Sequence, residues 1–343
     1  MLIDTILYKR IKEKKRHLDS LRPLPKTILK KIKEQFAVEM TYHSNAIEGN
    51  TLSLRETQLV LEEGLTIAGK SLREHLEAIN HKEAIDFLER LAQKRERITE
   101  TLVRQLHFLI LTKIDDREAG KYRSSQVRIT GTDYLPPRPF KIPVLMRNFI
   151  RWLKQNERKL NPIELSALAH FKLVHIHPFV DGNGRTGRLL MNFILMQKGY
   201  PPVIILKADR KKYYRTLDQA HQGNLVPFVN FVAGSAERSL NLYLPAFERK
   251  KTTKKEARKK EYISLAEAAE GTPYSQEYLS LLARRGKIEA FKLKRNWLTT
   301  REAIEKYIKN RSVSHIPRRS RDPGPSLGSH SDRDGGHRPS QRA

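Results

Sequence analysis

The chain has 343 residues, enough for two domains, with 38% hydrophobic residues, 30% charged residues and a formal net charge of +28. It has no cysteine, which excludes disulfides, thiolate nucleophiles and cysteine-ligated zinc and fits a reducing cytoplasm, where we expect the protein to reside. The apolar stretch at 189–196 is much shorter than a membrane helix of about 20 residues, so no membrane span is expected.

Residues 1–110 have the apolar periodicity of amphipathic helices. Hydrophobic residues recur at helical spacing in 24–44, 71–93 and 100–114. The segment "SNAIEGN" (44–50) ends the first of these helices, and its glycine is an ordinary helix terminator. We therefore predict an N-terminal helical region over 1–110.

The pattern changes in "AGKYRSSQVRITGTDYLPPRP" (119–139). Val127 and Ile129 alternate with polar residues, Gly131 favours a turn, and two prolines end the segment. This pattern predicts a short β-hairpin or an extended flap. The sequence predicts that helices resume after it, and the mainly α-helical core then runs over 111–247. These helices are expected at 143–156, 163–176, 184–198, 209–222 and 225–247, the last interrupted near Pro227.

The segment "HPFVDGNGRTGR" (177–188) connects two of these helices. Pro178 disfavours helical geometry at His177, so the preceding helix should end there. Gly182 and Gly184 allow a tight turn and a close approach of backbone to a ligand. A Gly-Asn-Gly turn that leads into a helix presents unpaired N–H groups and the positive end of the helix dipole to an anion.

The charged side chains of this segment indicate a polyphosphate. Arg185 and Arg188 lie three positions apart on one helix face, and two arginines exceed what a single carboxylate requires. Asp181 would repel phosphates unless a divalent cation such as Mg²⁺ lies between them, and His177 could accept the proton of an attacking hydroxyl. Two alternatives remain: each residue has only a structural role, or His175, His177 and Asp181 bind a transition metal, which leaves the arginines unexplained.

Residues 248–260 are predicted to form a basic linker, in which 249–260 carries eight lysines and arginines against a single acid. Such a run either binds a polyanion such as nucleic acid or is simply a solvated face.

A second small unit is predicted at 261–310. Ser264 and Glu267 match a capping box for a short helix, and a second helix follows Pro273. Residues 287–300 alternate like a two-stranded wing, after which Thr299 and Glu302 would cap a last helix. This order predicts a winged helix-turn-helix domain, followed by a disordered tail over 311–343, where proline, glycine, serine and arginine dominate.

The motif at 177–188 resembles the signature of the Fic-domain family, His-x-Phe-x-Asp/Glu-Gly-Asn-Gly-Arg-x-x-Arg, at every specified position. The resemblance extends over 40–247 and implies a Fic-type helical core with a hairpin flap. It implies transfer of AMP from ATP to a Ser, Thr or Tyr hydroxyl of a target protein and of the protein itself, with Mg²⁺ as cofactor.

The resemblance also implies a role for each site residue. His177 would be the base, Asp181 the Mg²⁺ ligand, Arg185 a contact of the β-phosphate and Arg188 a contact of the γ-phosphate. The remaining implied nucleotide-binding residues are Gly182, Asn183, Gly184, Thr186, Gly187, Tyr213, Tyr214 and His221, the last standing where a relative carries Asn. The flap residues Val127, Arg128, Ile129 and Thr130 would border the nucleotide and hold the target segment as an added strand.

A second motif, at 44–50, is similar to the inhibitory pattern of the family, Ser/Thr-x-x-x-Glu-Gly/Asn. It matches at Ser44, Glu48 and Gly49. The match implies autoinhibition, because Arg188 can pair with the carboxylate of Glu48 or with the γ-phosphate, but not fully with both. In some relatives the same glutamate helps to remove the modification, so reverse activity is a further option.

The unit at 261–310 is similar to the excisionase-like winged helix-turn-helix group. The resemblance implies DNA contacts at Tyr274, Ser275, Gln276, Arg284, Arg285, Lys292, Lys294 and Arg295. A module for protein docking or for a homodimer is the alternative.

Three functions are therefore compatible with the sequence. An autoinhibited protein adenylyltransferase is favoured over a DNA-binding regulator whose Fic core only senses nucleotide, because sensing does not need His177. A different phosphate-containing donor is the third option, and the two arginines favour a triphosphate over it.

Overall fold

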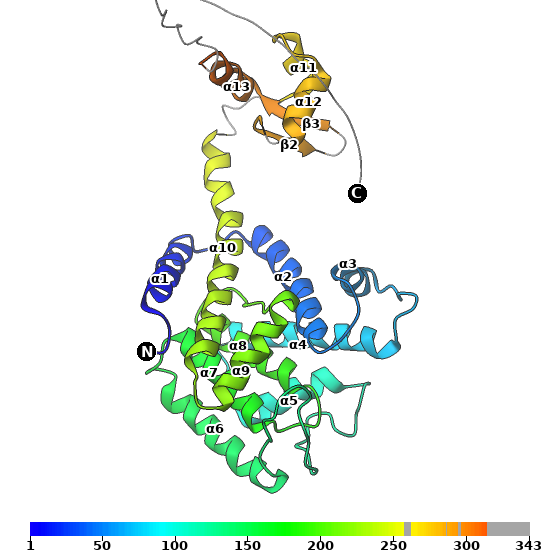
Figure 1. Ribbon diagram of the computed structural model, residues 1–343, viewed down its shortest axis with the longest axis vertical. Coiled ribbons are helices and arrows are strands. Elements are labelled where there is room, and N and C mark those ends of the chain that lie inside the picture. Colours follow the sequence, from blue (N-terminus) through cyan, green and yellow to red (C-terminus); the bar gives the residue numbers. More distant parts are fainter. Residues whose placement is uncertain (257–261, 286, 294–295, 314–343) are drawn as a thin grey trace, which may run out of the picture. The chain divides into compact units, whose positions relative to one another are not determined.

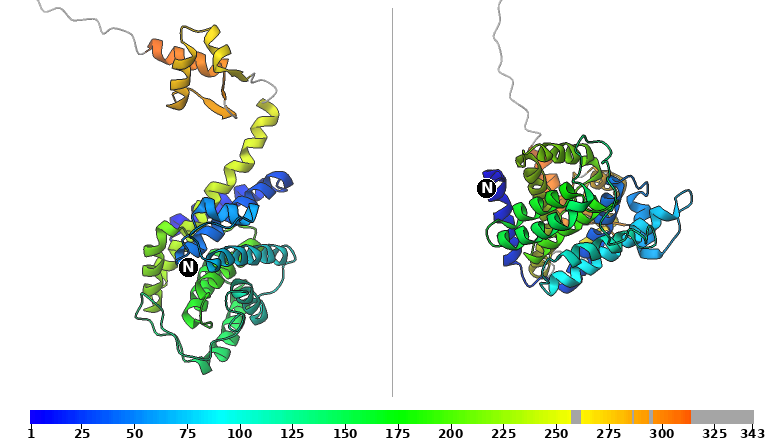
Figure 2. Two further views of the ribbon diagram at one scale, coloured as in Figure 1. Left: turned by 90° about the vertical axis from the view of Figure 1, so that its right-hand side faces the viewer. Right: turned by 90° about the horizontal axis from the view of Figure 1, so that it is seen from below.

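The computed structural model describes residues 1–256, 262–285, 287–293 and 296–313 (Figures 1 and 2). The chain divides into two compact units, Met1–Thr253 and Lys254–Ala343. Helices dominate both units, as the sequence predicts, and the strands described belong to a small antiparallel sheet in the second unit. Among these residues, no helix is at once long enough and apolar enough to cross a lipid bilayer.

Every regular element within residues 1–253, all of which are described, is a helix. Ser53 and Ser71 each form a capping box with the glutamate three positions later, and Asn161 caps the helix that leads to the motif at 177–188. In chain order the elements are α1 (Thr5–Ser20), α2 (Lys26–Ile47), α3 (Leu54–Gln58), the π-helical turn η1 (Leu59–Glu63), α4 (Leu72–Gln93), α5 (Glu100–Leu111), the 3₁₀ turn η2 (Pro139–Lys141), α6 (Ile142–Asn156), α7 (Pro162–Ile176), α8 (Asn183–Gln197), the 3₁₀ turn η3 (Lys207–Asp209), α9 (Arg210–His221) and α10 (Val226–Glu256).

Helix α7 is apolar on nearly all sides, so it lies buried at the centre of this unit. The face that carries Leu165 and Leu173 packs in a cluster with α6, and the other face joins the main core. Helix α8 lies close along α7 (Figure 1), since a side chain on Gly187 would meet His170 at 3.3 Å. The turn 177–182, which joins these two helices, is therefore held by core packing on both sides.

The helices predicted at 143–156, 163–176, 184–198 and 209–222 are present within one residue as α6 to α9. The last helix differs from its prediction, because Pro227 lies in the first turn of α10 and does not interrupt it. Proline is tolerated there, since the N–H that it lacks would have no partner within the helix. Helix α10 continues to Glu256, so the first part of the predicted linker is helical, and 257–260 lies outside the described residues.

The β-hairpin predicted at 119–139 does not form. Residues 121–138, here called the flap, contain no helix or strand and turn at Gly131, whose φ is 86°. Side chains join the two arms: the amide of Gln126 donates to the carbonyl of Pro136 at 2.9 Å, and Arg123 donates to the carbonyl of Pro137. The two prolines have no N–H for a strand ladder, which explains why the flap takes the extended form instead.

The second unit contains three short helices and three strands within its described residues. The predicted pair of strands is present, and a further strand pairs with it in the order β1-β3-β2, all antiparallel. The elements are β1 (Tyr262–Ser264), α11 (Leu265–Glu270), α12 (Gln276–Arg284), β2 (Ala290–Leu293), β3 (Asn296–Thr300) and α13 (Arg301–Val313).

Helix caps in this unit partly match their prediction. Ser264 and Glu267 form the predicted capping box of α11. The hydroxyl of Thr300, not that of Thr299, accepts from the backbone of α13, because the hydroxyl of Thr299 donates to the carbonyl of Glu289. Helix α13 continues to Val313, so the first residues of the predicted disordered tail are helical, and 314–343 lies outside the described residues.

Candidate active site

His177 ends α7 in a left-handed conformation, with φ 49° and ψ 60°. This conformation is uncommon for a residue with a side chain and is typical of functional sites. The half-buried ring donates from Nδ1 to the carbonyl of Val174 at 3.4 Å, which leaves Nε2 with a lone pair. Burial, aided by the charge of Arg123, lowers the pKa of His177 to about 4, so the ring is neutral at pH 7 and able to accept a proton.

The turn after His177 presents a helix N-terminus without a side-chain cap. Asn183 begins α8, and its buried side chain both accepts from the N–H of Phe179 at 3.0 Å and donates to the carbonyl of the same residue at 2.8 Å. Gly182 precedes it in a left-handed conformation that a larger residue would resist. The side chain of Asn183 thus locks the turn, and the backbone N–H groups of the first helical turn are what remains for an anion.

His107 connects this turn to the base of the flap. The N–H of Gly120 donates to Nδ1 of His107 at 2.9 Å, so Nε2 carries the proton and donates to the carbonyl of Asp181, also at 2.9 Å. The ring stacks on Phe179 at a centroid distance of 3.6 Å. Burial lowers the pKa of His107 to about 4, which keeps it in this neutral form.

Asp181 and Arg185 belong to a network of charges between α8 and α4. Arg185 lies 3.2 Å from Asp181 and 3.2 Å from Glu77, and Arg73 lies 2.9 Å from Asp181. Burial alone would raise the pKa of Asp181. The pKa lies below its usual value because the charge of Arg185, the N–H of Gly182 and the charge of Arg73 outweigh burial. The carboxylate is therefore ionised and already surrounded by donors.

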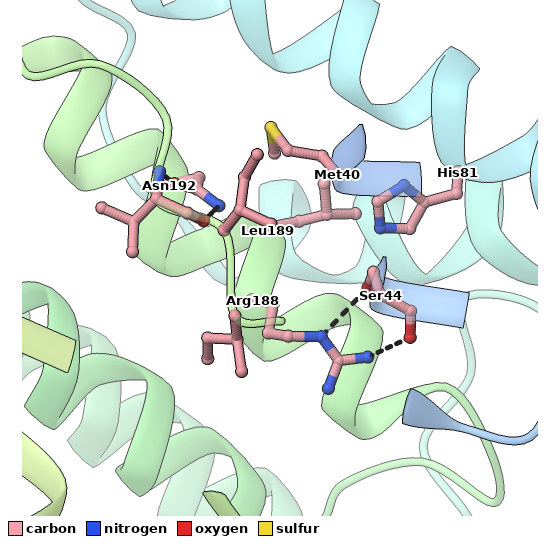
Figure 3. Close-up of a pocket in the computed structure, with 9 residues that line it drawn as sticks. Met40, Ser44, His81, Arg188, Leu189 and Asn192 are labelled. Atoms are coloured by element: carbon pink, nitrogen blue, oxygen red, sulfur yellow. Dashed lines mark hydrogen bonds between the residues drawn. The ribbon is translucent and has the colours of Figure 1, made fainter. Parts of the chain in front are cut away.

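Arg188 lies buried one turn further along α8, where α2 supplies its partners (Figure 3). Its guanidinium donates to the hydroxyl of Ser44 at 3.0 Å and to the carbonyl of Ser44 at 2.9 Å, and it forms an ion pair of 2.8 Å with Glu48. Burial opposes the charge, but the carboxylate of Glu48 outweighs burial and raises the pKa of Arg188. The space beside Arg188 in Figure 3 holds only about 10 Å³, room for one water at most.

Glu48 lies directly over the turn. A Cβ atom built on Gly184 would overlap Oε1 of Glu48, so no side chain is compatible with the carboxylate at this position. The carboxylate therefore occupies the mouth of the cradle that Gly182, Asn183 and Gly184 form, in the place that a bound anion would approach.

The two tyrosines of α9 have different surroundings. Tyr213 is 1% exposed, and its hydroxyl lies 2.9 Å from Nε2 of His170 and 3.4 Å from Arg188. The prediction that Tyr213 approaches the nucleotide does not fit this burial, and the residue supports Arg188 instead. Tyr214 is partly exposed, and its hydroxyl lies 3.5 Å from Glu48, while its contact with the nucleotide stays a prediction.

Thr186 and Gly187 were predicted to bind nucleotide, but the structure places them in helix packing. The hydroxyl of Thr186 donates to the carbonyl of Gly182 at 2.9 Å and is fully buried. Gly187 faces His170 of α7. Of the predicted residues of α8, only Arg185 and Arg188 bring side-chain charge to the site.

His221 contacts the flap and His175. The Nδ1 atoms of His221 and His175 lie 2.9 Å apart, and the ring of Tyr134 stacks on His221 at 3.8 Å. Among the described contacts, none joins 127–130 to His177 or to the cradle, so the predicted role of Val127, Arg128, Ile129 and Thr130 remains a prediction.

The donor set at the turn fits Mg²⁺ better than a transition metal. Mg²⁺ in nucleotide sites takes one or two carboxylates and completes its shell with phosphate oxygens and water. Asp181 is 48% exposed and therefore reachable. His175 pairs with His221 instead of sharing a position with Asp181, and the described residues contain no group of three His, Asp or Glu that could hold a metal.

Several residues that shape this site carry no sequence signal. Arg73 and Glu77 lie on α4 about 100 positions before the turn, and His107, Arg123 and His170 resemble ordinary helix or loop residues in the sequence. Only their contacts in the folded chain connect them to the motif.

The residues predicted to contact DNA are partly described. Gln276, Arg284 and Arg285 are exposed, while Ser275 caps α12 and accepts from the backbone of Tyr278 at 3.3 Å. Tyr274 is partly buried against Tyr278. The side chains of Lys292, Lys294 and Arg295 lie outside the described residues.

Comparison with known proteins relates the chain to one family. The sequence profile of the Fic/DOC family matches residues 97–195. Protein adenylyltransferase Fic of Drosophila virilis is 44% identical over 217 residues, which cover 63% of this chain and 44% of that protein. The corresponding protein of Aedes aegypti is 41% identical over 244 residues, or 71% and 48% of the two chains. The chain thus spans less than half the length of these curated relatives.

Solved structures agree. A Fic domain containing signaling protein from Bacteroides thetaiotaomicron is 33% identical with a TM-score of 0.66, and the match covers 70% of this chain and 98% of that one. A segment of Fic-1 from C. elegans is 37% identical with a TM-score of 0.64, over 71% of this chain and 74% of that one.

Proposed function

This chain belongs to the Fic/DOC family, and from this premise we propose that it transfers AMP from ATP to a hydroxyl side chain of a protein. The observation that supports this function best is the neutral ring of His177 beside the uncapped N-terminus of α8, with Arg185 and Arg188 on the first turns of the same helix. A proton acceptor, an anion cradle and two cations are the parts that phosphoryl and nucleotidyl transfer require.

The reaction follows from these parts. The acceptor hydroxyl attacks the α-phosphorus, and its proton passes to Nε2 of His177 as the new O–P bond forms. The bond between the α-phosphorus and the bridging oxygen breaks, and pyrophosphate leaves with the electron pair. The N–H groups of the cradle and the guanidinium of Arg185 stabilise the charge that develops on the phosphate oxygens.

The donor set at the turn supports Mg²⁺ as cofactor. Asp181 would hold the ion together with phosphate oxygens, and the ion would neutralise charge between the carboxylate and the phosphates. In the same site Arg73 and Arg185 keep Asp181 ionised and oriented before nucleotide binds.

Autoinhibition by Glu48 is part of the proposal. The γ-phosphate needs Arg188, which Glu48 and Ser44 already bind, and the Glu48 carboxylate covers Gly184. ATP that binds beside this carboxylate has its α-phosphate out of line for attack, and positioning carries most of the catalysis in this chemistry.

One labelling experiment tests the function against nucleotide sensing. The wild type, Glu48→Gly and Glu48→Gly/His177→Ala are incubated with Mg²⁺ and with ATP labelled at the α-phosphate, with and without a cell extract as a source of targets. An adenylyltransferase labels protein in the Glu48→Gly sample and loses the label without His177. ATP labelled at the γ-phosphate is the control for the transferred group. A sensor that binds ATP without covalent label in any sample would rule out the proposed function.

A further inference from the structure

Arg123 is a buried cation whose partners are all backbone carbonyls. It lies near the start of the flap and is among the largest fully buried side chains of the described residues, at 2% exposure. Nε donates to the carbonyl of His177 at 2.8 Å, one terminal nitrogen donates to the carbonyl of Ser125 at 2.9 Å, and the other donates to the carbonyl of Pro137. Within the described residues no carboxylate forms an ion pair with it.

A cation without a counterion is costly to bury, so this arrangement has to be explained. Burial lowers the pKa of Arg123, which is the expected sign of this cost, although the guanidinium stays charged at any ordinary pH. Replacing the cation by an apolar residue would avoid the cost. A guanidinium offers something that an apolar residue and a lysine cannot: rigid, planar donors that reach several acceptors in fixed directions.

The acceptors come from separate parts of the site. Ser125 lies in the outgoing arm of the flap and Pro137 in the returning arm, and the third acceptor is the carbonyl of His177 itself. The backbone N–H of Arg123 also donates to the carbonyl of Pro178 at 3.0 Å. One residue therefore binds both arms of the flap and two consecutive carbonyls at the end of α7.

The bond to His177 acts on a residue that needs support. A left-handed backbone at a residue with a side chain persists only when surrounding contacts hold it. The ring direction follows from this backbone, because the side chain leaves the same α-carbon. A loss of the contact would let the ring and the flap move independently of each other.

We propose that Arg123 is a positioning residue that fixes the flap to the backbone of His177, so that the acceptor hydroxyl held at the flap meets the base in the right geometry. This inference rests on the proposed function for its catalytic consequence, but the structural link between flap and base can be measured without any activity. Arg123 does not touch the reacting atoms.

The test compares Arg123→Lys with Arg104→Lys, both in the Glu48→Gly background. Arg104 is a matched control, because it also donates to a backbone carbonyl at the base of the flap, that of Gly120 at 2.8 Å, but contacts neither His177 nor the returning arm. Lysine keeps the positive charge at position 123 but lacks the rigid, planar donors of the guanidinium. We expect Arg123→Lys to lower kcat by about 100-fold, the usual effect of a misplacement near 1 Å, with KM for ATP changed by less than about threefold. Arg104→Lys should keep kcat within about threefold.

Hydrogen exchange is the readout independent of catalysis. Amides of 124–135 should exchange at least about fivefold faster in Arg123→Lys than in Arg104→Lys, and those of α4 should not change. If the flap amides exchange at the same rate in the two variants, the proposal is overturned, whether or not AMP is transferred. If no variant labels protein but the exchange difference is found, the proposed function fails and the structural link stands.

A measurement on the unsubstituted protein covers the case in which Arg123→Lys does not fold. In NMR spectra the Nε–H of Arg123 should exchange with solvent at least about 1,000-fold more slowly than that of the exposed Arg151. Similar exchange of the two groups would show that the guanidinium is not held and would overturn the proposal.

Discussion

The carboxylate of Glu48 lies 2.8 Å from the guanidinium of Arg188, across 140 positions of sequence. The pair joins the end of α2 to the second turn of α8, and the Arg188 side chain is only 5% exposed. Ser44 holds the same guanidinium from the same helix. The end of α2 therefore supplies both the partners of a buried cation and the carboxylate that covers the cradle.

Substituting Glu48 by glycine should increase AMP transfer by about tenfold or more, because Arg188 is released for the γ-phosphate and the mouth of the cradle opens. Removal of one partner of a largely buried pair also destabilises the protein, and about 1–2 kcal/mol is expected here because Glu48 is partly exposed and Ser44 remains. Saturating ATP should restore the melting temperature. Label incorporation and thermal melts measure the two effects.

Glu48→Gln is the matched control for charge, since it keeps the shape of the side chain. It should give an intermediate rate, because the amide still covers Gly184 but no longer pairs with the cation of Arg188. Transfer by Glu48→Gly at or below the wild-type rate, with normal ATP binding, would contradict autoinhibition.

Substituting Asp181 by asparagine should separate metal binding from nucleotide binding. Without the carboxylate, ATP affinity in the presence of Mg²⁺ should fall by about tenfold, because the ion loses its protein ligand. Affinity for ATP in EDTA should stay the same or rise, since a charge that repels phosphate is removed. Calorimetry in the Glu48→Gly background measures both. An equal loss with and without the metal would mean that Asp181 supports only the fold of the turn.

The buried histidines should make the protein sensitive to acid. Burial, followed by the charge of Arg188, lowers the pKa of His81 and of His170 to about 3. An unfolded histidine titrates near 6.5 and therefore binds a proton that the folded one cannot, so stability rises with pH between about 3 and 6.5. The stability that the neutral histidines contribute is fully present above about pH 6.5 and is lost as the pH falls toward about 3. Each of these two histidines should lower the free energy of unfolding by about 2 kcal/mol at pH 5 relative to pH 7.

Denaturant unfolding at pH 7.5 and pH 5.5 tests this dependence. His170→Gln should reduce the difference in unfolding free energy between the two pH values, whatever its effect on stability at pH 7.5, because one titrating group is removed. An unchanged pH difference in His170→Gln would show that His170 is accessible to protons in the folded protein.

The sequence predicted the parts of the site that are local. The end of α7 at His177 follows from Pro178, and the cradle follows from two glycines that flank Asn183. The pair of Glu48 with Arg188 is not local, and only the resemblance of 44–50 to a family pattern suggested it. The physical reason is that residues far apart in the sequence are brought together only by the packing of the core, and no local sequence pattern predicts which of them meet.

Predictions failed where a short pattern had to decide between two structures. Val127 and Ile129 alternate as in a strand, but two apolar positions bury too little to specify a hairpin, and the prolines at 136 and 137 cannot complete one. The role of Arg123 was beyond sequence reasoning, since a lone arginine in a polar segment normally lies in solvent. Its partners are backbone carbonyls, which every residue has, so the residue types in the sequence do not indicate which carbonyls it contacts.

The second unit should bind duplex DNA through Arg284 and Arg285, which are exposed at the end of α12. Two cations that contact phosphates release counterions, and each contributes about 0.9 to the slope of log affinity against log salt. Arg284→Gln/Arg285→Gln in the full chain should therefore reduce that slope by about 2. Arg147→Gln/Arg151→Gln is the matched control, because both residues are exposed on α6 in the first unit and the same charge is removed. If the two pairs of substitutions reduce the slope equally, DNA responds only to the net charge of the chain, and the second unit has to be explained as a protein-docking module.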